Sequence, residues 1–389
     1  MIQSRSDLAQ ARRIVVKIGS SLLADAESGI QQDVIDHLVG EVARLMALGI
    51  QVVIVTSGSV ALGRVRLNWL DRELSVHEKQ AAAAIGQPKL MRAYGQAFDR
   101  HGLSVAQMLL TKDDLRHRRR YLNTSNTSET LFSVGVVPIV NENDTVVVAE
   151  IKFGDNDSLG ALVSLVVDAD LLVMLTDVAG LYDKNPTQHA DAKRVDIIHH
   201  LNDEHIAMAG DAGSSFGTGG MASKLSAASV ATGGGVAAAI ISGQSKGTLS
   251  RLLAGGDEGT LFLCGEDRQT KRKHWISEVL QAAGTIHIDQ GAANALLKTG
   301  SSLLPVGVTA VDGVFDKGDC VTIVDAANTP IAKGLCNYTA EEMRLIMGHG
   351  SDEIEAILGF HDFSSLIHRD NLVITTATLN SNSPSGDST

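Results

Sequence analysis

Short apolar runs alternate with longer segments of helical periodicity over the first two-thirds of the chain. The apolar runs that we interpret as buried strands are Ile14–Lys17, Gln51–Thr56, Val136–Val140, Leu171–Thr176 and Ala237–Ile241, and the segments that we interpret as helices include Val34–Leu48 and Ser158–Val167. Strands that alternate with helices predict the α/β class, with a mostly parallel sheet sandwiched by helices. Ligands on such sheets bind at the carboxyl ends of the strands.

The pattern changes near residue 281, where short alternating segments separated by Gly and Asp predict a small β-rich domain. A polar and basic stretch precedes this point, and a Ser/Asn-rich stretch ends the chain. We therefore predict an α/β domain at 1–265, a linker at 266–280, a β-rich domain at 281–378 and a disordered tail at 379–389.

The composition supports this division. A chain of 389 residues is longer than a single core usually spans, so two domains are expected. Apolar residues make up 44% of the chain and aromatic residues only 4%, so the core consists mainly of Ala, Val, Leu and Ile, which suits a buried parallel sheet. The net charge of −12 counts against a general nucleic-acid binder, which needs Lys and Arg to displace phosphate counterions.

The sequence also bears on the compartment. Three cysteines with no C-x-x-C spacing indicate a reducing environment and no structural zinc. The N-terminal segment has no apolar core of signal-peptide length, and no run of eighteen apolar residues occurs. We expect a cytoplasmic protein without a membrane span.

Candidate chemistry begins at the ends of the first two predicted strands. Val15–Ser21 (VVKIGSS) places the ammonium group of Lys17 and several free N–H groups where they can cradle phosphate oxygens. Thr56–Ser59 (TSGS) has small residues that let a ligand approach the backbone closely. Each motif alone has the alternative interpretation of a helix cap.

Acids and amides are concentrated in Asn141–Asp144 (NEND) and Phe153–Ser158 (FGDNDS), which we expect in two loops separated by a short β-like segment. Carboxylate and amide oxygens suit an α-ammonium group or a magnesium-bound nucleotide. A hairpin with Asx turns is the alternative. Function is favoured because so many neighbouring acids are costly unless a cation joins them.

Two later motifs add a second lysine. Leu175–Asp183 (LTDVAGLYD) places a hydroxyl and a carboxylate at a strand end, and Phe216–Lys224 (FGTGGMASK) is a Gly-rich loop leading into a predicted helix. The loop is not a P-loop, because Lys224 does not follow the last Gly directly. Lys17 and Lys224 together predict a two-pronged phosphate clamp.

These motifs carry a family resemblance. In this order and at these spacings, VVKIGSS, VTSGS, VNENDTV, FGDND, TDVAGLY and GTGGMASK resemble the amino acid kinase family, and within it the members that phosphorylate the γ-carboxylate of L-glutamate at the first step of proline synthesis. The resemblance runs from about Arg13 to Asp370, and the C-terminal part is similar to a PUA domain.

The resemblance implies a set of site residues. We hypothesise that Lys17 and Lys224 neutralise the transferring phosphoryl group and that Asp157 orients them. Ser57, Asp144 and Asn156 are expected to hold glutamate. The residues expected to hold ATP are Lys17, Thr176, Asp177, Thr218, Gly219, Gly220, Met221, Ala222, Ser223 and Lys224. Magnesium is expected to be carried by ATP, with no protein ligand assigned.

The resemblance also implies partners: proline as a feedback inhibitor, a glutamyl phosphate reductase that takes the product, and a homo-oligomer, either a dimer or a tetramer. An N-acetylglutamate or aspartate kinase is the alternative among enzymes, although the NEND–GDND pair and the C-terminal domain speak against it. RNA binding through the PUA-like domain is the alternative from another class. Residues 281–375 hold five Lys or Arg against twelve Asp or Glu, a balance of −7, which argues against it.

Overall fold

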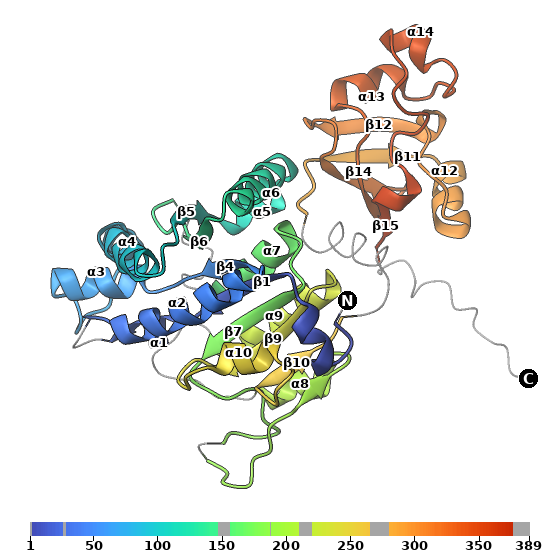
Figure 1. Ribbon diagram of the computed structural model, residues 1–389. Helices are drawn as coiled ribbons and strands as arrows, with labels where there is room; N and C mark the ends of the chain where they lie inside the picture. The colour runs from blue at the N-terminus through green and yellow to red at the C-terminus, as the bar shows by residue number, and fades with distance from the viewer. Residues whose placement is uncertain are drawn as a thin grey trace, which may run out of the picture. The chain divides into compact units, whose positions relative to one another are not determined.

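A computed structural model describes the protein at residues 2–25, 29–146, 156–186, 188–209, 220–264 and 280–375, the side chain of Arg118 excepted (Figure 1). The chain divides into two compact units, Met1–Leu115 with Tyr121–Glu266 and Arg116–Arg120 with Asp267–Thr389. The predicted linker, apart from Leu280, and the predicted tail lie outside the described residues. The exact domain limits therefore stay predictions.

The first unit contains an eight-stranded sheet in the order β5-β6-β4-β1-β7-β9-β10-β8. Along that order the strands are Val105–Leu110, Val137–Glu142, Gln51–Val55, Arg13–Ile18, Leu171–Thr176, Ala237–Ser242, Thr260–Phe262 and Ile197–Ile198. Every neighbouring pair is parallel except β9 and β10. The prediction of a mostly parallel sheet is confirmed, and the five predicted strands are β1, β4, β6, β7 and β9.

The two faces of the sheet are covered by different helices (Figure 1). On one face, alternate residues such as Ile14 and Val16 join one buried cluster with α2 (Gln32–Ala47), α4 (Val76–Asp99) and α10 (Thr248–Leu253). On the other face, α7 (Asn156–Val166) packs on β1, and α9 (Met221–Gly233) packs beside α7. Because both faces of the central strands are buried, the five predicted strands are mostly apolar, which is why they could be recognised from sequence.

The remaining elements of the first two-thirds of the chain are short or peripheral. They are η1 (Arg5–Gln10), α1 (Ser20–Leu23), β2 (Ala24–Asp25), β3 (Gly29–Ile30), α3 (Ser59–Leu67), α5 (Lys112–Arg116), α6 (Arg118–Ser133) and α8 (Asp203–Met208). Within the described ranges, no helix combines the length and the apolar character that a membrane crossing needs.

Helices α3 and α4 pack with their backbones in contact. A Cβ atom on Gly86 would lie 1.8 Å from the carbonyl oxygen of Ser59, and one on Gly63 would lie 1.8 Å from that of Ala82. Only glycine fits such an approach. The contact fixes the middle of α4 against the turn that follows β4.

The second unit has its own five-stranded sheet, in the order β12-β11-β13-β14-β15. Along that order the strands are Val308–Gly313, Gly284–Ile288, Cys320–Val324, Pro330–Leu335 and Leu372–Ile374. Its helices are α12 (Gln290–Asn294), η3 (Ala295–Thr299), η4 (Pro305–Gly307), α13 (Ala340–Ile346), α14 (Ile354–Leu358) and η5 (Arg369–Asn371). A separate core that includes Ile286, Ile323 and Tyr338 confirms the prediction of a small β-rich domain.

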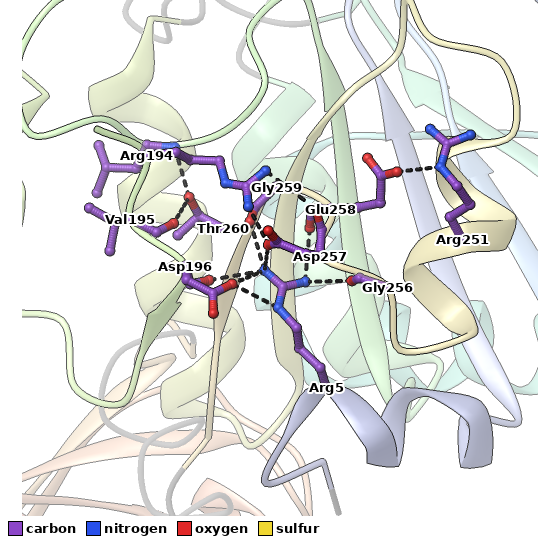
Figure 2. A network of polar contacts seen from close by, with 11 residues as sticks. Arg5, Arg194, Val195, Asp196, Arg251, Gly256, Asp257, Glu258, Gly259 and Thr260 are labelled. Atoms are coloured by element: carbon purple, nitrogen blue, oxygen red, sulfur yellow. Dashed lines mark hydrogen bonds and ion pairs between the residues drawn. The ribbon is translucent and has the colours of Figure 1, made fainter. Parts of the chain in front are cut away.

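One arginine ties the N-terminal segment to the far edge of the first sheet (Figure 2). The guanidinium group of Arg5 donates to the carbonyl oxygens of Gly256, Glu258 and Gly259 at 3.0, 3.0 and 2.8 Å. Its Nε donates to Asp196 Oδ1 at 2.8 Å. The planar fork of Arg matches such a fixed set of acceptors, and its side chain is only 11% exposed. Arg5 therefore joins η1 to the segments around β8 and β10.

We expect Arg5→Met to lower the free energy of unfolding of the first unit by about 2–4 kcal/mol, because several charge-assisted hydrogen bonds are lost. Urea denaturation followed by circular dichroism measures the change. Lys184→Met is the control, since it removes an ion pair to Asp191 whose two side chains are 37% and 77% exposed and should change stability by about 0–1 kcal/mol. Equal stability of the two variants would contradict the role of Arg5.

Candidate functional site

Four neighbouring strands, β6, β4, β1 and β7, end at the same edge of the sheet because they are parallel. Asp144 follows β6 by two residues, Ser57 follows β4 by two, Lys17 is the last but one residue of β1, and Thr176 ends β7. The predicted site residues of these strands therefore form a row along the edge. The row runs from the acid and amide motifs at β6, through Lys17, to the hydroxyl and carboxylate at β7.

Two buried lysines meet one buried carboxylate in the middle of this row. Lys17 Nζ lies 2.6 Å from Asp157 Oδ1, and Lys224 Nζ lies 3.3 Å from Asp157 Oδ2. Ser223 Oγ donates to Asp157 Oδ2 at 2.6 Å. The side chain of Asp157 is 1% exposed, and those of Lys17 and Lys224 are 6% and 7% exposed. Together the three side chains carry one net positive charge.

Three different elements supply this cluster. Lys17 comes from β1, Asp157 from the first turn of α7, and Lys224 from the first turn of α9. Helix α7 can lie this close to Lys17 because Gly160 faces it, and a Cβ there would be 3.3 Å from Lys17 Cβ. The structure thus brings together the three residues that we predicted to be catalytic.

The pKa of Asp157 lies below its ordinary value. Burial alone would raise it, but the ammonium groups of Lys17 and Lys224 and the hydroxyl of Ser223 outweigh that effect. Asp157 is therefore ionised at neutral pH. Since the folded pKa is lowered, its contribution to stability is present above the pKa of the unfolded chain and is lost as the pH falls through the folded value.

The N-terminus of α9 lies next to the cluster. The N-cap is Gly220, which makes no side-chain cap hydrogen bond, and the first helical residues are Met221 and Ala222. An uncapped helix N-terminus favours a bound anion, because N–H groups and the helix dipole point toward it. Thr218 and Gly219, which we also predicted to hold ATP, lie outside the described residues.

At the end of β7, Thr176 is buried and Asp177 is exposed. Thr176 Oγ1 donates to Asp177 Oδ1 at 2.9 Å. The pair thus presents a carboxylate at the edge of the sheet on the β7 side of Lys17.

Asp144 stands on the opposite side of the row, where it is 8% exposed. Ser59 Oγ donates to Asp144 Oδ2 at 2.9 Å. Burial raises the pKa of Asp144, and the hydrogen bond from Ser59 only partly opposes that effect. Both residues line a cleft of about 270 Å³ between α4 and the ends of β5 and β6.

Side-chain amides of Gln87, Asn141 and Asn156 form a hydrogen-bonded cluster that includes the ends of β4 and β6. Asn156 Nδ2 lies 2.7 Å from the carbonyl oxygen of Thr56, 2.9 Å from Ser57 Oγ and 3.0 Å from Asn141 Oδ1, so its two hydrogens are shared among three acceptors. Asn141 Nδ2 in turn donates to Gln87 Oε1 at 2.8 Å. The predicted substrate residues Ser57 and Asn156 are therefore in direct contact.

The sequence analysis missed several of these partners. Ser59 and Asn141 stand within motifs that we singled out, but we gave them no role. Gln87 gave no signal, because one glutamine in a long helix is unremarkable before its neighbours are known. Gln87 reaches this cluster because the preceding residue, Gly86, packs against α3. That contact exists only in the folded chain.

Local structure differs from the expectation at two points. Asn141 and Glu142 belong to β6, and Asn156 and Asp157 open α7, so these residues are held in regular structure where we expected loops. For the strand the physical reason is backbone pairing, because Asn141 and Glu142 continue the parallel ladder of β6 with β5 opposite Leu109 and Leu110. Residues 147–155, with the β-like segment expected there, lie outside the described part.

Each of the first two motifs is a turn from a strand into a helix, as the helix-cap alternative expects, but no side chain makes the cap. Gly19 and Gly58 are the N-caps of α1 and α3, and neither helix has a side-chain cap hydrogen bond. Both turns thus bring glycine backbone to the edge of the sheet.

The burial of Asp144 leads to a prediction. Because its folded pKa is raised above the ordinary value of 3.8, the ionised carboxylate destabilises the folded chain at neutral pH. We expect Asp144→Asn to be more stable than the unaltered protein at pH 7, with Ser59 still donating to the new amide oxygen. The gain should shrink as the pH is lowered toward 4, which urea denaturation at several pH values measures. A variant less stable at pH 7 would contradict this account.

The sequence matches known protein families over both parts of the chain. The sequence model of the amino acid kinase family matches residues 12–242, and that of the PUA domain matches residues 284–358. Curated glutamate 5-kinases from Trichlorobacter lovleyi, Geobacter sulfurreducens and Methylococcus capsulatus are 47%, 48% and 49% identical to this chain. The alignments cover 96%, 94% and 96% of this chain and 99%, 98% and 100% of those proteins. The chain therefore belongs to the amino acid kinase family and, within it, to the glutamate 5-kinases that carry a PUA domain.

Proposed function

We propose that the protein transfers the γ-phosphoryl group of ATP to the side-chain carboxylate of L-glutamate, giving L-glutamyl 5-phosphate at the first step of proline synthesis. The observation that carries this proposal is the pair of buried ammonium groups, Lys17 and Lys224, held on the two oxygens of Asp157. Relatives named glutamate 5-kinase, aligned over nearly the whole chain, support the choice of substrate.

The reaction needs no general base. A glutamate side chain has an ordinary pKa of about 4.3, so the attacking carboxylate is already ionised at neutral pH. The difficulty is to bring this anion in line with an anionic phosphoryl group and to stabilise the charge that spreads over it in the transition state. In this proposal, Lys17 on β1 and Lys224 on α9 neutralise that charge from two directions.

Asp157 acts as the common partner that positions the two lysines. Because the two ammonium groups lower its pKa, Asp157 stays ionised, forms ion pairs with both lysines and takes no proton during the reaction. A carboxylate fixed between two lysines also sets the distance between their charges before ATP binds. This preorganisation is the main source of electrostatic catalysis at such sites.

The two sides of the cluster hold the two substrates. On the β6 side, the Asp144 carboxylate and the Asn156 amide oxygen suit the α-ammonium group of glutamate, and Ser57 lies next to Asn156. An ammonium partner for Asp144 would offset the burial that raises its pKa. On the β7 side, Thr176, Asp177 and the segment from Thr218 to Lys224 hold ATP.

The residues present fit a triphosphate. The uncapped start of α9 supplies N–H groups, and the lysine pair supplies positive charge. Magnesium bound to the nucleotide phosphates supplies further positive charge when present, and we assign it no protein ligand.

Other parts of the proposal rest on family membership. We propose a cytoplasmic homo-oligomer whose labile product passes to a glutamyl phosphate reductase, and inhibition by proline at or beside the glutamate site. For the PUA domain, the balance of −7 over residues 281–375 favours a structural or regulatory role over RNA binding.

We expect Lys17→Met and Lys224→Met each to lower kcat by at least about 100-fold, because each removes one of two charges that stabilise the transition state. Steady-state kinetics measures the loss, and circular dichroism checks the fold. Lys246→Met, at an exposed lysine, is the control and should leave kcat unchanged. Near-normal turnover by either cluster variant would exclude its catalytic role.

The substrate is tested by trapping the acyl phosphate. Incubation with ATP, magnesium, hydroxylamine and L-glutamate should give glutamyl hydroxamate, whereas L-aspartate and N-acetyl-L-glutamate should give no comparable signal. A signal with one of the other acids would keep the phosphoryl chemistry but overturn the substrate. No signal with any of the three would overturn the proposed reaction.

A further inference from the structure

Three buried side-chain amides from three different elements form one continuous chain of hydrogen bonds. Gln87 belongs to α4, Asn141 to β6 and Asn156 to α7, and they are 8%, 1% and 4% exposed. Asn156 Nδ2 donates to Asn141 Oδ1, and Asn141 Nδ2 donates to Gln87 Oε1. Only Asn156 has a role in the proposed function.

Main-chain groups fix the direction of this chain at two points. An amide can in principle turn over and exchange its donor with its acceptor. However, the N–H of Glu142 donates to Asn141 Oδ1 at 2.9 Å, and a backbone N–H can only donate. At the other end, the carbonyl oxygen of Thr56 accepts from Asn156 Nδ2 and can only accept. Both asparagines therefore have one favourable orientation.

The fixed direction leaves one group free at each end. Among the described residues, the buried atoms Asn156 Oδ1 and Gln87 Nε2 have no hydrogen-bond partner. A buried polar atom without a partner costs about 1–3 kcal/mol, so such atoms are rare unless a ligand satisfies them. Asn156 Oδ1 is an acceptor, which matches a positively charged donor such as the α-ammonium group of an amino acid.

Helix α4 is held rigidly where Gln87 lies. The neighbouring Gly86 contacts the carbonyl oxygen of Ser59, the first residue of α3, and this contact admits no side chain. The hydroxyl of the same Ser59 donates to Asp144, and Gln87 lines the cleft together with both residues. The acceptor Gln87 Oε1 is therefore fixed relative to the groups on the β6 side of the site.

We propose that Gln87 is a positioning residue for the amino-acid substrate: its Oε1 holds Asn141, and Asn141 holds Asn156 with its amide oxygen presented to the α-ammonium group. This role rests on the proposed function. Gln87 does not touch the substrate in this arrangement. Without its acceptor, the donor of Asn141 loses its partner and the asparagine loses one of the bonds that fix its orientation.

The test uses the full-length protein and the hydroxamate assay with L-glutamate. Gln87→Met removes the acceptor at similar volume, and we expect it to raise KM for glutamate roughly tenfold. KM for ATP and kcat should change less than about twofold, because the lysine cluster is untouched. Gln96→Met, at an exposed glutamine of the same helix, is the matched control and should change none of these constants.

A double-mutant cycle separates positioning from direct contact. If Gln87 acts through Asn156, Gln87→Met should have no further effect on KM in a protein that already carries Asn156→Ala. If the two substitutions raise KM by factors that multiply, Gln87 acts independently of Asn156 and the proposed positioning role is overturned.

Gln87→Glu is the second variant if Gln87→Met does not fold. Burial favours the neutral acid, which keeps an acceptor oxygen in place, so KM should stay within about twofold of normal.

The unaltered protein serves as the control that separates failure of the proposed kinase activity from failure of the proposed role of Gln87. If the unaltered protein forms no glutamyl hydroxamate, the proposed function fails and this role of Gln87 fails with it. If the unaltered protein is active, and if Gln87→Met folds and has a normal KM for glutamate, then only the positioning role of Gln87 is overturned. A tenfold rise in KM that disappears in the Asn156→Ala background supports it.

Discussion

The arrangement of the first unit depends on one interaction, the pairing of two buried lysines with Asp157. Three charges this far from water are strongly destabilising unless they are joined with good geometry. Lys17 and Lys224 satisfy this condition on opposite oxygens of the carboxylate. Because they come from β1 and α9, while Asp157 opens α7, the strand and both helices have to meet in one relative position. The interaction thus links the packing of the sheet with the place where charge is concentrated.

Two aspartates of this edge illustrate how environment decides what a carboxylate can do. Asp157 is the more buried, yet its pKa is lowered because two ammonium groups outweigh the effect of burial. Among the residues that the structure describes, the partner of Asp144 is the hydroxyl of Ser59, and burial raises its pKa. The first is a fixed negative charge that organises its neighbours. The second is a buried carboxylate for which a cationic group would be a favourable partner, as expected on the amino-acid side of the proposed site.

The central strands and the lysine–aspartate cluster could be predicted from the sequence, because the informative residues lie in or next to the buried strands. Both faces of the sheet are covered, so the strands appear as apolar runs, and Lys17, Asp157 and Lys224 stand in motifs next to their ends. Partners that meet only through packing could not be predicted. Arg5 finds its acceptors more than 190 residues away along the chain, and Gln87 reaches Asn141 because two helices touch at Gly63 and Gly86. The helical start at Asn156 was missed for the same reason.

The most direct test of the account is the kinetics of Asp157→Asn. The substitution preserves shape but removes the negative charge that the two lysines share, so their mutual repulsion is no longer compensated and their positions are no longer set. The account predicts a fall in kcat of at least about 100-fold in a folded protein that still binds glutamate with a KM within a few-fold of normal. A folded variant with nearly normal kcat would contradict the claim that Asp157 organises the catalytic lysines.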